Sequence, residues 1–158
     1  MDDVGLNIRF ARTDDSRLAA LAPPHWRRKA AEKRFQRDRE QELVAGGLLA
    51  DMIADLHLGL DDLAIEEDPS GKPRLRSHPG IHFSLSHTEG LAMCVVADHP
   101  VGCDVEKVVP LDDDLKRAIG SLEAWTLKEA AFKCGPSAVP RPHPAPSGYC
   151  AALAEIMV

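Results

Sequence analysis

The chain has 158 residues, a formal net charge of −6, 44% hydrophobic residues and 28% charged residues. This balance is typical of one globular domain, or of two small halves that share a core. The four cysteines show no CxxC spacing, so we expect reduced thiols and neither a zinc site nor a disulfide framework. The first residues lack the basic and apolar segments of a signal peptide, and no apolar run is long enough to cross a membrane. We therefore expect a cytoplasmic protein that does not span a membrane.

The acidic chain carries one basic stretch, in residues 27–39. An isolated basic segment indicates a local anionic partner and not general nucleic-acid affinity. Nucleic-acid binding is further disfavoured because two Trp and four Phe residues offer no stacking platform for bases. For any single basic side chain in the stretch, a solvated helix face is the alternative interpretation.

The first part of the chain predicts a strand followed by helix. Residues 8–10 are expected to form the strand, and Pro23-Pro24 suits the first turn of a helix. Residues 25–58 have a helical composition. A break is predicted near Asp38, where Asp38 and Gln41 fit an N-cap and its N3 partner.

Three short strands are predicted next, after the turn sequence of residues 68–73. Residues 81–86 alternate between apolar and polar side chains, residues 91–97 are continuously apolar, and residues 101–108 form the third strand. Because the connections are short turns, we expect the three strands to form an antiparallel meander.

The rest of the chain predicts helix and then an irregular segment. Residues 112–133 are helical in composition, with a break at Gly120-Ser121. Residues 136–146 contain many prolines and are expected to form a loop. Residues 149–156 fit a strand and a short helix equally well.

Two carboxylates, Asp104 and Glu106, stand two residues apart in a predicted strand, so both point to the same face. Their α-carbons are about 6.6 Å apart, because a strand rises about 3.3 Å per residue. At that spacing the carboxylates can converge on one hard cation, and without a cation one of them should have a raised pKa. The alternative is a solvent-facing strand edge with ordinary acidic residues.

A second group of candidate residues lies in the predicted helix WTLKEAAFK. Its Trp125, Glu129 and Lys133 are spaced by four residues and therefore climb one side of the helix. A surface ion pair is the alternative for Glu129 and Lys133. Together with the two strand carboxylates, however, Glu129 would be the third acidic ligand of a Mg²⁺ site with a lysine beside it. That combination suits phosphoryl chemistry.

A third group follows the predicted turn. The sequence GKPRL presents Lys72 on a turn, and FSLSH places Ser86 and His87 at the end of a strand. A hydroxyl and an imidazole there could hold a phosphate, although short loops commonly carry such residues.

These three groups, in this order, resemble the 4′-phosphopantetheinyl transferase superfamily, and most closely its larger type, which activates surfactin synthetase and related carrier-protein systems. The resemblance covers most of residues 25–134. It is carried by GKPRL (Gly71–Leu75), FSLSH (Phe83–His87), PVGCDVEKV (Pro100–Val108) and WTLKEAAFK (Trp125–Lys133), and the predicted helix Arg34–Ile53 also resembles the family's helix before the GKP turn.

The resemblance implies Mg²⁺-dependent transfer of the 4′-phosphopantetheine arm of coenzyme A to a serine of an apo acyl, peptidyl or aryl carrier protein, with release of 3′,5′-ADP. By the same resemblance, Glu129 would be the base and Lys133 would neutralise charge on the diphosphate. The implied metal ligands are Asp104, Glu106 and Glu129. The implied coenzyme A-binding residues are Lys72, Pro73, Ser86, His87, Lys128 and Arg34.

The resemblance also implies an α+β fold, a pseudo-twofold pair of halves that each pack a helix on a small antiparallel sheet. We expect a coenzyme A-binding half at residues 1–100 and an abbreviated metal-binding half at residues 101–158. Because one chain carries both sets of motifs, we expect a monomer. The alternative is a catalytically inactive, coenzyme A-binding or partner-binding remnant; the short second half favours it, and the intact carboxylate set opposes it.

Overall fold

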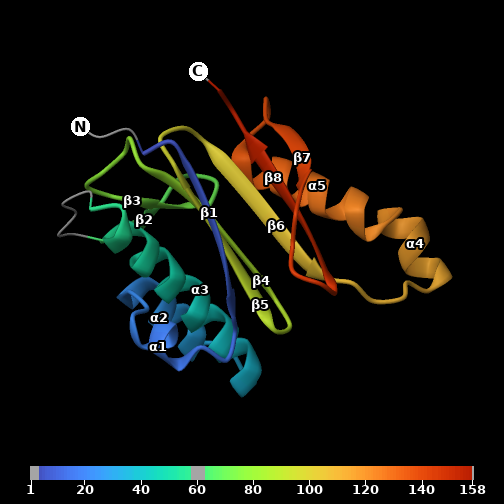
Figure 1. Cartoon of the computed structure of the whole chain (residues 1–158), viewed down its shortest axis with the longest axis horizontal. Helices are drawn as coiled ribbons and strands as arrows, with labels where there is room; N and C mark the ends of the chain where they lie inside the picture. The colour runs from blue at the N-terminus through green and yellow to red at the C-terminus, as the bar shows by residue number, and fades with distance from the viewer. Residues whose placement is uncertain (1–3, 58–62, 158) are drawn as a thin grey trace.

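The computed structural model describes residues 4–57 and 63–157, which form helices and antiparallel sheets (Figure 1). The predicted α+β class is therefore confirmed. No helix in these ranges is long and apolar enough to cross a membrane. The elements are β1 (Leu6–Arg12), α1 (Ser16–Ala20), α2 (Pro24–Ala31), α3 (Gln36–Asp55), β2 (Ile65–Glu67), β3 (Pro73–Leu75), β4 (His82–Thr88), β5 (Leu91–Ala97), β6 (Val101–Lys107), α4 (Asp113–Ile119), α5 (Leu122–Cys134), β7 (Val139–His143) and β8 (Tyr149–Glu155).

Two three-stranded sheets organise the chain, with strand orders β1-β5-β4 and β6-β8-β7, and β2 pairs with β3 separately. In each three-stranded sheet, the strand that comes latest in the sequence lies in the centre and pairs antiparallel with both neighbours. The predicted meander is correct for β4 and β5 but wrong for β6, which pairs with β8 and begins the second sheet.

The two sheets pack face to face between α3 and α5, so the chain has four layers (Figure 1). Alternate residues of β5 serve two cores. Ala92, Cys94 and Val96 face α3, whereas Met93 and Val95 pack against the apolar residues of β6 and β8. Burial on both faces explains why the sequence of β5 is continuously apolar, with no polar alternation.

The predicted helix over residues 25–58 is two helices, α2 and α3. The second begins after Phe35, its N-cap, so the predicted N-cap at Asp38 is wrong. Asp38 lies in the first turn of α3, where a carboxylate still favours the positive end of the helix dipole. The side chain of Arg39 donates to the carbonyl of Lys33 at 2.8 Å, which ties the connection to the start of α3.

The proline-rich segment is not the irregular loop that the sequence predicts, because it contains β7. This strand lies at the edge of the second sheet, with Pro140 opposite Ala154 and Pro142 opposite Ala152. An edge strand tolerates proline because one side of its backbone needs no ladder hydrogen bonds. Residues 149–156, for which the sequence fits a strand and a short helix equally well, contain the strand β8.

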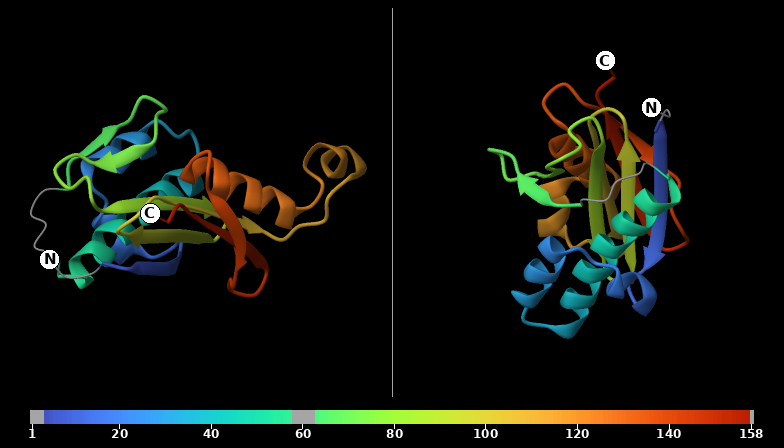
Figure 2. Two further views of the ribbon diagram at one scale, coloured as in Figure 1. Left: turned by 90° about the horizontal axis from the view of Figure 1, so that it is seen from above. Right: turned by 90° about the vertical axis from the view of Figure 1, so that its left-hand side faces the viewer.

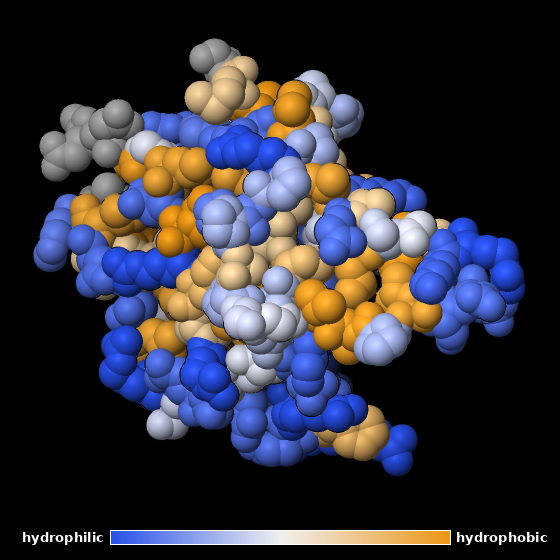
Figure 3. All heavy atoms as spheres, turned by 45° about the vertical axis from the view of Figure 1, so that its right-hand side comes forward, coloured by the Kyte–Doolittle hydropathy of each residue, from blue (hydrophilic) through white to orange (hydrophobic). Residues whose placement is uncertain are grey.

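Helix α4 has no buried residue, and Figure 2 shows it projecting from one end of the molecule. The break between α4 and α5 falls at Gly120-Ser121, as predicted. In the surface view, this projecting end is mostly hydrophilic, and hydrophobic side chains gather where it joins the rest of the chain (Figure 3). Val108, Val109 and Leu115 are among the exposed hydrophobic residues of this part.

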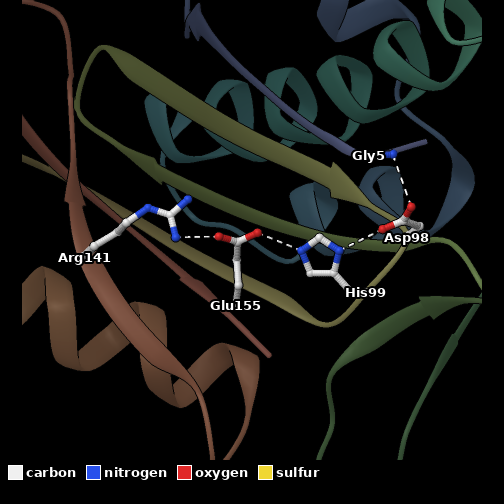
Figure 4. A network of polar contacts seen from close by, with 5 residues as sticks. All are labelled: Gly5, Asp98, His99, Arg141 and Glu155. Atoms are coloured by element: carbon white, nitrogen blue, oxygen red, sulfur yellow. Dashed lines mark hydrogen bonds and ion pairs between the residues drawn. The ribbon is translucent and has the colours of Figure 1, made fainter. Parts of the chain in front are cut away.

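A network of polar contacts ties four segments of the chain together (Figure 4). His99, in the turn between β5 and β6, has Nδ1 2.8 Å from Asp98 Oδ1 and Nε2 2.7 Å from Glu155 Oε1. Glu155, at the end of β8, also pairs with Arg141 of β7. The Gly5 N–H, just before β1, donates to Asp98 Oδ2 at 3.3 Å. The network therefore joins both sheets at one end of their strands.

The charges in this network shift both central pKa values. Burial lowers the pKa of His99, but hydrogen bonds to Asp98 and Glu155 outweigh it, so that pKa is raised from 6.5. Burial raises the pKa of Glu155, but His99 and Arg141 outweigh it, so that pKa is lowered from 4.5. Linkage then gives a stabilisation that is largest between these two ordinary values. It is lost as the pH rises through the folded-state pKa of His99, or falls through that of Glu155.

We predict that in His99→Gln the unfolding free energy depends less on pH above the ordinary pKa of histidine than it does in the wild type. Below the pKa of His99 the variant should lose about 1.5–3 kcal/mol of unfolding free energy, because hydrogen bonds to charged groups contribute about that much. The difference from wild type should shrink as His99 deprotonates. Urea unfolding between about pH 6 and about pH 9 measures it. The exposed His57→Asn is the control, and a difference between His99→Gln and wild type that does not change with pH contradicts the assignment.

Candidate active site where the two sheets meet

The alternation predicted for β6 is observed. Val101, Cys103 and Val105 lie in the core between the sheets, and Asp104 lies on the opposite face, where α5 packs. Gly102 shares that face. A Cβ atom at Gly102 would stand 2.1 Å from the Ala130 carbonyl oxygen, so a side chain there would prevent α5 from approaching β6. The close contact brings the helix of Glu129 and Lys133 to the strand of Asp104 and Glu106.

Asp104 is only 5% exposed, and its two carboxylate oxygens differ. Its Oδ1 accepts a hydrogen bond from Ser86 Oγ at 3.0 Å and lies 3.6 Å from Lys133 Nζ. Its Oδ2 is buried and, among the described residues, no basic, amide or hydroxyl group donates to it; the carboxyl group of Glu106 is the partner with which Asp104 can share a proton. Buried polar atoms are almost always paired, so a buried carboxylate oxygen without such a donor marks a place where a cation or a donor belongs.

Asp104 raises the pKa of Glu106, as the spacing of these two carboxylates predicts. Burial, together with the charge of Asp104 and a hydrogen bond to it, raises the pKa of Glu106 to about 7. Burial also raises the pKa of Asp104; Lys133 and Ser86 oppose this effect, and the charge of Glu129 adds to it. Two carboxylates that favour neutralisation are a suitable donor set for a hard cation.

The three carboxylates that the resemblance implies as metal ligands do not form a ready-made cluster in this structure. Within residues 4–57 and 63–157, no group of three His, Cys, Asp or Glu side chains stands close enough to hold a metal ion. Asp104 and Glu106, with the buried Oδ2 of Asp104, are the residues that fit a hard cation. Glu129 is half-buried on α5 and affects the pKa of Asp104 through its charge.

A cavity of about 610 Å³ opens beside these residues, between α2, α3, the GKP turn and the end of α5. This volume is within the usual range for small-molecule sites. Three lysines, Lys29, Lys72 and Lys133, line it, together with the two carboxylates of Glu42 and Asp68. Trp26 and Phe83 supply apolar wall.

The GKP turn is built by one carboxylate. Asp68 Oδ1 accepts from the N–H groups of Ser70 at 2.8 Å and Lys72 at 3.0 Å, and Gly71 supplies the positive φ of +87° that the turn requires. Lys72 Nζ then reaches across to the Val101 carbonyl of β6 at 3.0 Å. Burial is the main cause that lowers the pKa of Lys72.

Both ring nitrogens of His87 are engaged by α3. Nδ1 lies 2.9 Å from Gln41 Oε1, and Nε2 lies 2.6 Å from Glu42 Oε2. Lys29 Nζ lies 3.4 Å from the other oxygen of Glu42. Burial raises the pKa of Glu42, but the hydrogen bond and charge of His87, with the charge of Lys29, bring it down to about 2. The cavity wall therefore holds an ionised, buried carboxylate.

The structure separates the predicted coenzyme A-binding residues into two sets. Lys72, Pro73 and His87 line the cavity, together with Lys133. Ser86, Lys128 and Arg34 do not. Lys128 is exposed on α5, and the Arg34 guanidinium lies 5.5 Å from the centre of the Phe35 ring, in the connection between α2 and α3.

Sequence reasoning missed Glu42 and gave Lys29 no specific role. For Glu42 a usable signal exists, because this acidic residue stands on the face of α3 that otherwise carries buried apolar residues. Lys29 looks like one more member of the basic stretch, and only the fold distinguishes it from its exposed neighbours.

The junction between the sheets is made by side chains. β4 and β6 run in the same direction, and contacts between them keep a constant separation of 19 residues along the chain. Hydroxyl groups of β4 accept hydrogen bonds from N–H groups of β6, which explains why β6 does not continue the meander. The donor–acceptor pairs are Cys103 N to Ser84 Oγ at 3.1 Å, Val105 N to Ser86 Oγ at 3.1 Å and Lys107 N to Thr88 Oγ1 at 3.4 Å.

Lys133 completes this junction. Its Nζ donates to the Leu85 carbonyl of β4 at 3.2 Å and to the Cys103 carbonyl of β6 at 3.0 Å. The ammonium group therefore holds the two strands together and also stands at the border of the cavity, beside Asp104.

The chain is similar to several curated proteins, while no protein-family model matches it. The 4′-phosphopantetheinyl transferase psf-1 of Bacillus pumilus is 35% identical over an alignment of 128 residues; the match covers 68% of this chain and 55% of the relative. The 4′-phosphopantetheinyl transferase Sfp of Bacillus subtilis is 23% identical over 109 residues, or 68% of this chain and 49% of the relative. The 4′-phosphopantetheinyl transferase gsp of Aneurinibacillus migulanus is 24% identical over 101 residues. The chain spans about half the length of these curated relatives.

We predict that Glu106→Gln stabilises the metal-free protein above neutral pH. The raised pKa of about 7, against 4.5, means that folding is penalised as Glu106 ionises, and the amide removes that penalty. The gain should be about 1 kcal/mol, because the half-exposed group is partly screened by solvent. It should vanish near pH 4, where both states are protonated. Thermal unfolding at the two pH values measures the gain.

The matched control for this variant is Glu123→Gln, an exposed carboxylate in the first turn of α5 that changes the net charge equally. It should show no such gain. A Glu106→Gln protein that is less stable than wild type above neutral pH would contradict the assigned electrostatics.

Proposed function

Because the chain belongs to the 4′-phosphopantetheinyl transferase superfamily, we propose that it transfers the phosphopantetheine arm of coenzyme A to a serine of an apo carrier protein. The serine oxygen attacks the phosphorus that bears the pantetheine arm. The diphosphate bond breaks and 3′,5′-ADP leaves. The observation that supports this most directly is the cavity with three lysines beside Asp104, whose buried Oδ2 receives no hydrogen bond from a basic, amide or hydroxyl group of the described residues.

In this proposal Asp104 and Glu106 hold Mg²⁺, which when bound supplies charge neutralisation for the diphosphate. The support is the buried Asp104 Oδ2 and the pKa of about 7 at Glu106, both of which indicate carboxylates that a cation would stabilise. Glu129, on the adjacent helix, is the proposed base that takes the serine proton.

The lysines position the anionic substrate. Lys29 and Lys72 lie in the cavity wall, where they would bind the phosphates of coenzyme A. Lys133, beside Asp104, would meet the diphosphate where the cavity approaches the carboxylates. His87 is fixed by Gln41 and Glu42 and so presents a rigid wall to the ligand.

The proposal also includes the class of the partner protein and the oligomeric state of the enzyme. We expect an acyl, peptidyl or aryl carrier protein as partner and a monomeric enzyme, because one chain supplies both the cavity and the carboxylates. An approximate twofold relation between residues 1–100 and 101–158 remains a prediction.

Intact-mass spectrometry of several apo carrier proteins tests the function. After incubation with this protein, coenzyme A and Mg²⁺, at least one carrier should gain the mass of a single phosphopantetheine arm, and EDTA should prevent the gain. No gain on any carrier, with coenzyme A binding still detected by calorimetry, would indicate an inactive binding protein. Neither transfer nor binding would reject the proposal.

Removing either proposed charge should stop transfer without unfolding the protein. Asp104→Asn and Glu129→Gln should each lower the transfer rate by at least about 100-fold, the usual cost of losing one group that acts on transition-state charge. Both changes relieve repulsion among the acidic groups, so the melting temperature should stay the same or rise. The exposed Glu123→Gln is again the control, and full activity of Glu129→Gln would remove that residue from the mechanism.

A further inference from the structure

Ser86 belongs to the SH pair that the resemblance assigns to coenzyme A, yet it is placed differently from its neighbour. Ser86 is only 6% exposed and does not line the cavity, whereas His87 does. A hydroxyl in this position does not reach a ligand in the cavity, and its hydrogen bonds must serve another purpose.

Those hydrogen bonds connect two consecutive residues of β6. The Val105 N–H donates to Ser86 Oγ at 3.1 Å, and Ser86 Oγ donates to Asp104 Oδ1 at 3.0 Å. A serine hydroxyl has one proton and accepts through its lone pairs. Because the backbone N–H occupies an acceptor position, the single proton is directed to the carboxylate.

The arrangement determines which carboxylate oxygen is available. Oδ1 accepts from Ser86 and lies 3.6 Å from Lys133 Nζ, while Oδ2 is buried and receives no hydrogen bond from a basic, amide or hydroxyl group of the described residues. The torsion that turns an aspartate carboxylate is broad, so burial alone does not fix its orientation. The hydrogen bond from Ser86 to Oδ1 does, with Lys133 beside the same oxygen.

We propose that Ser86 is a positioning residue, which reaches across the junction from β4 and orients Asp104 so that Oδ2 faces the cation. This inference rests on the proposed function for the identity of the cation. It assigns Ser86 to the carboxylate and not to coenzyme A. Partners that orient metal ligands typically alter metal affinity by tenfold or more when they are removed.

Ser84 provides a matched control on the same strand. Its Oγ accepts from the Cys103 N–H at 3.1 Å, the same junction contact that Ser86 makes with Val105, and it is equally buried at 5% exposure. Among the described residues it has no hydrogen bond to a carboxylate, and unlike Ser86 it lines the cavity. Ser84→Ala and Ser86→Ala therefore each remove one junction hydrogen bond, and only Ser86→Ala releases Asp104.

The test measures Mn²⁺ binding to the protein without coenzyme A. The electron paramagnetic resonance signal of free Mn²⁺ reports how much of the ion is unbound. Ser86→Ala should bind Mn²⁺ about tenfold more weakly than wild type. Ser84→Ala should bind as wild type does, although its melting temperature should fall by a similar amount. Ser86→Thr, which keeps the hydroxyl, should recover most of the affinity, and coenzyme A affinity measured by calorimetry should be equal in the wild type and Ser86→Ala.

Three outcomes would overturn the inference. One is equal Mn²⁺ affinity of wild type and Ser86→Ala, and another is an equal loss in Ser84→Ala and Ser86→Ala, which would indicate a structural role alone. The third is a loss confined to coenzyme A affinity, which would return Ser86 to the ligand. If wild type transfers the arm under any of these outcomes, the proposed function stands and only the role of Ser86 fails. Absence of both transfer and Mn²⁺ binding in wild type would reject both.

Discussion

The hydrogen bonds between the hydroxyl groups of β4 and the backbone of β6 are the contacts on which the rest of the structure depends. They place the first strand of the second sheet beside the first sheet without a backbone ladder. Lys133 spans the same junction through two carbonyl groups. The cavity, the GKP turn and the acidic residues of β6 all meet along this line, so the chemistry of the site is inseparable from the way the sheets are joined.

The carboxylates of the site are buried where ionisation is unfavourable, and the rest of the fold must supply the stability that this burial costs. Burial raises the pKa values of Asp104 and Glu106, a cost that a purely structural strand would avoid. The cavity wall has the opposite character, because His87 and Lys29 keep the buried Glu42 ionised, with a pKa of about 2. The same chain thus contains two buried acidic centres: Glu42, which contacts His87 and Lys29, and the pair of Asp104 and Glu106, whose raised pKa values favour neutralisation.

Sequence reasoning found the elements and the acidic residues better than it found their connections. The alternation of β6 placed Asp104 correctly, because period two is a local property of a strand. The pairing of β6 with β8 and the strand at Val139–His143 were missed, because a sheet partner far along the chain leaves no local signal. The contacts of Ser86 also leave no local signal, because its hydrogen-bond partners Asp104 and Val105 belong to another strand. The engagement of Glu42 by His87 also depends on tertiary packing alone.

The strand order of the two sheets has a consequence for biosynthesis. In both sheets the central strand is translated after its two neighbours, so neither sheet can close while its earlier strands emerge from the ribosome. β5 completes the first sheet, but Met93 and Val95 on its second face stay uncovered until β6 and β8 arrive. A nascent chain halted between β5 and β8 would therefore display an apolar sheet face to the cell, and the speed of translation through residues 98–155 sets how long that surface is open to chaperones or to aggregation.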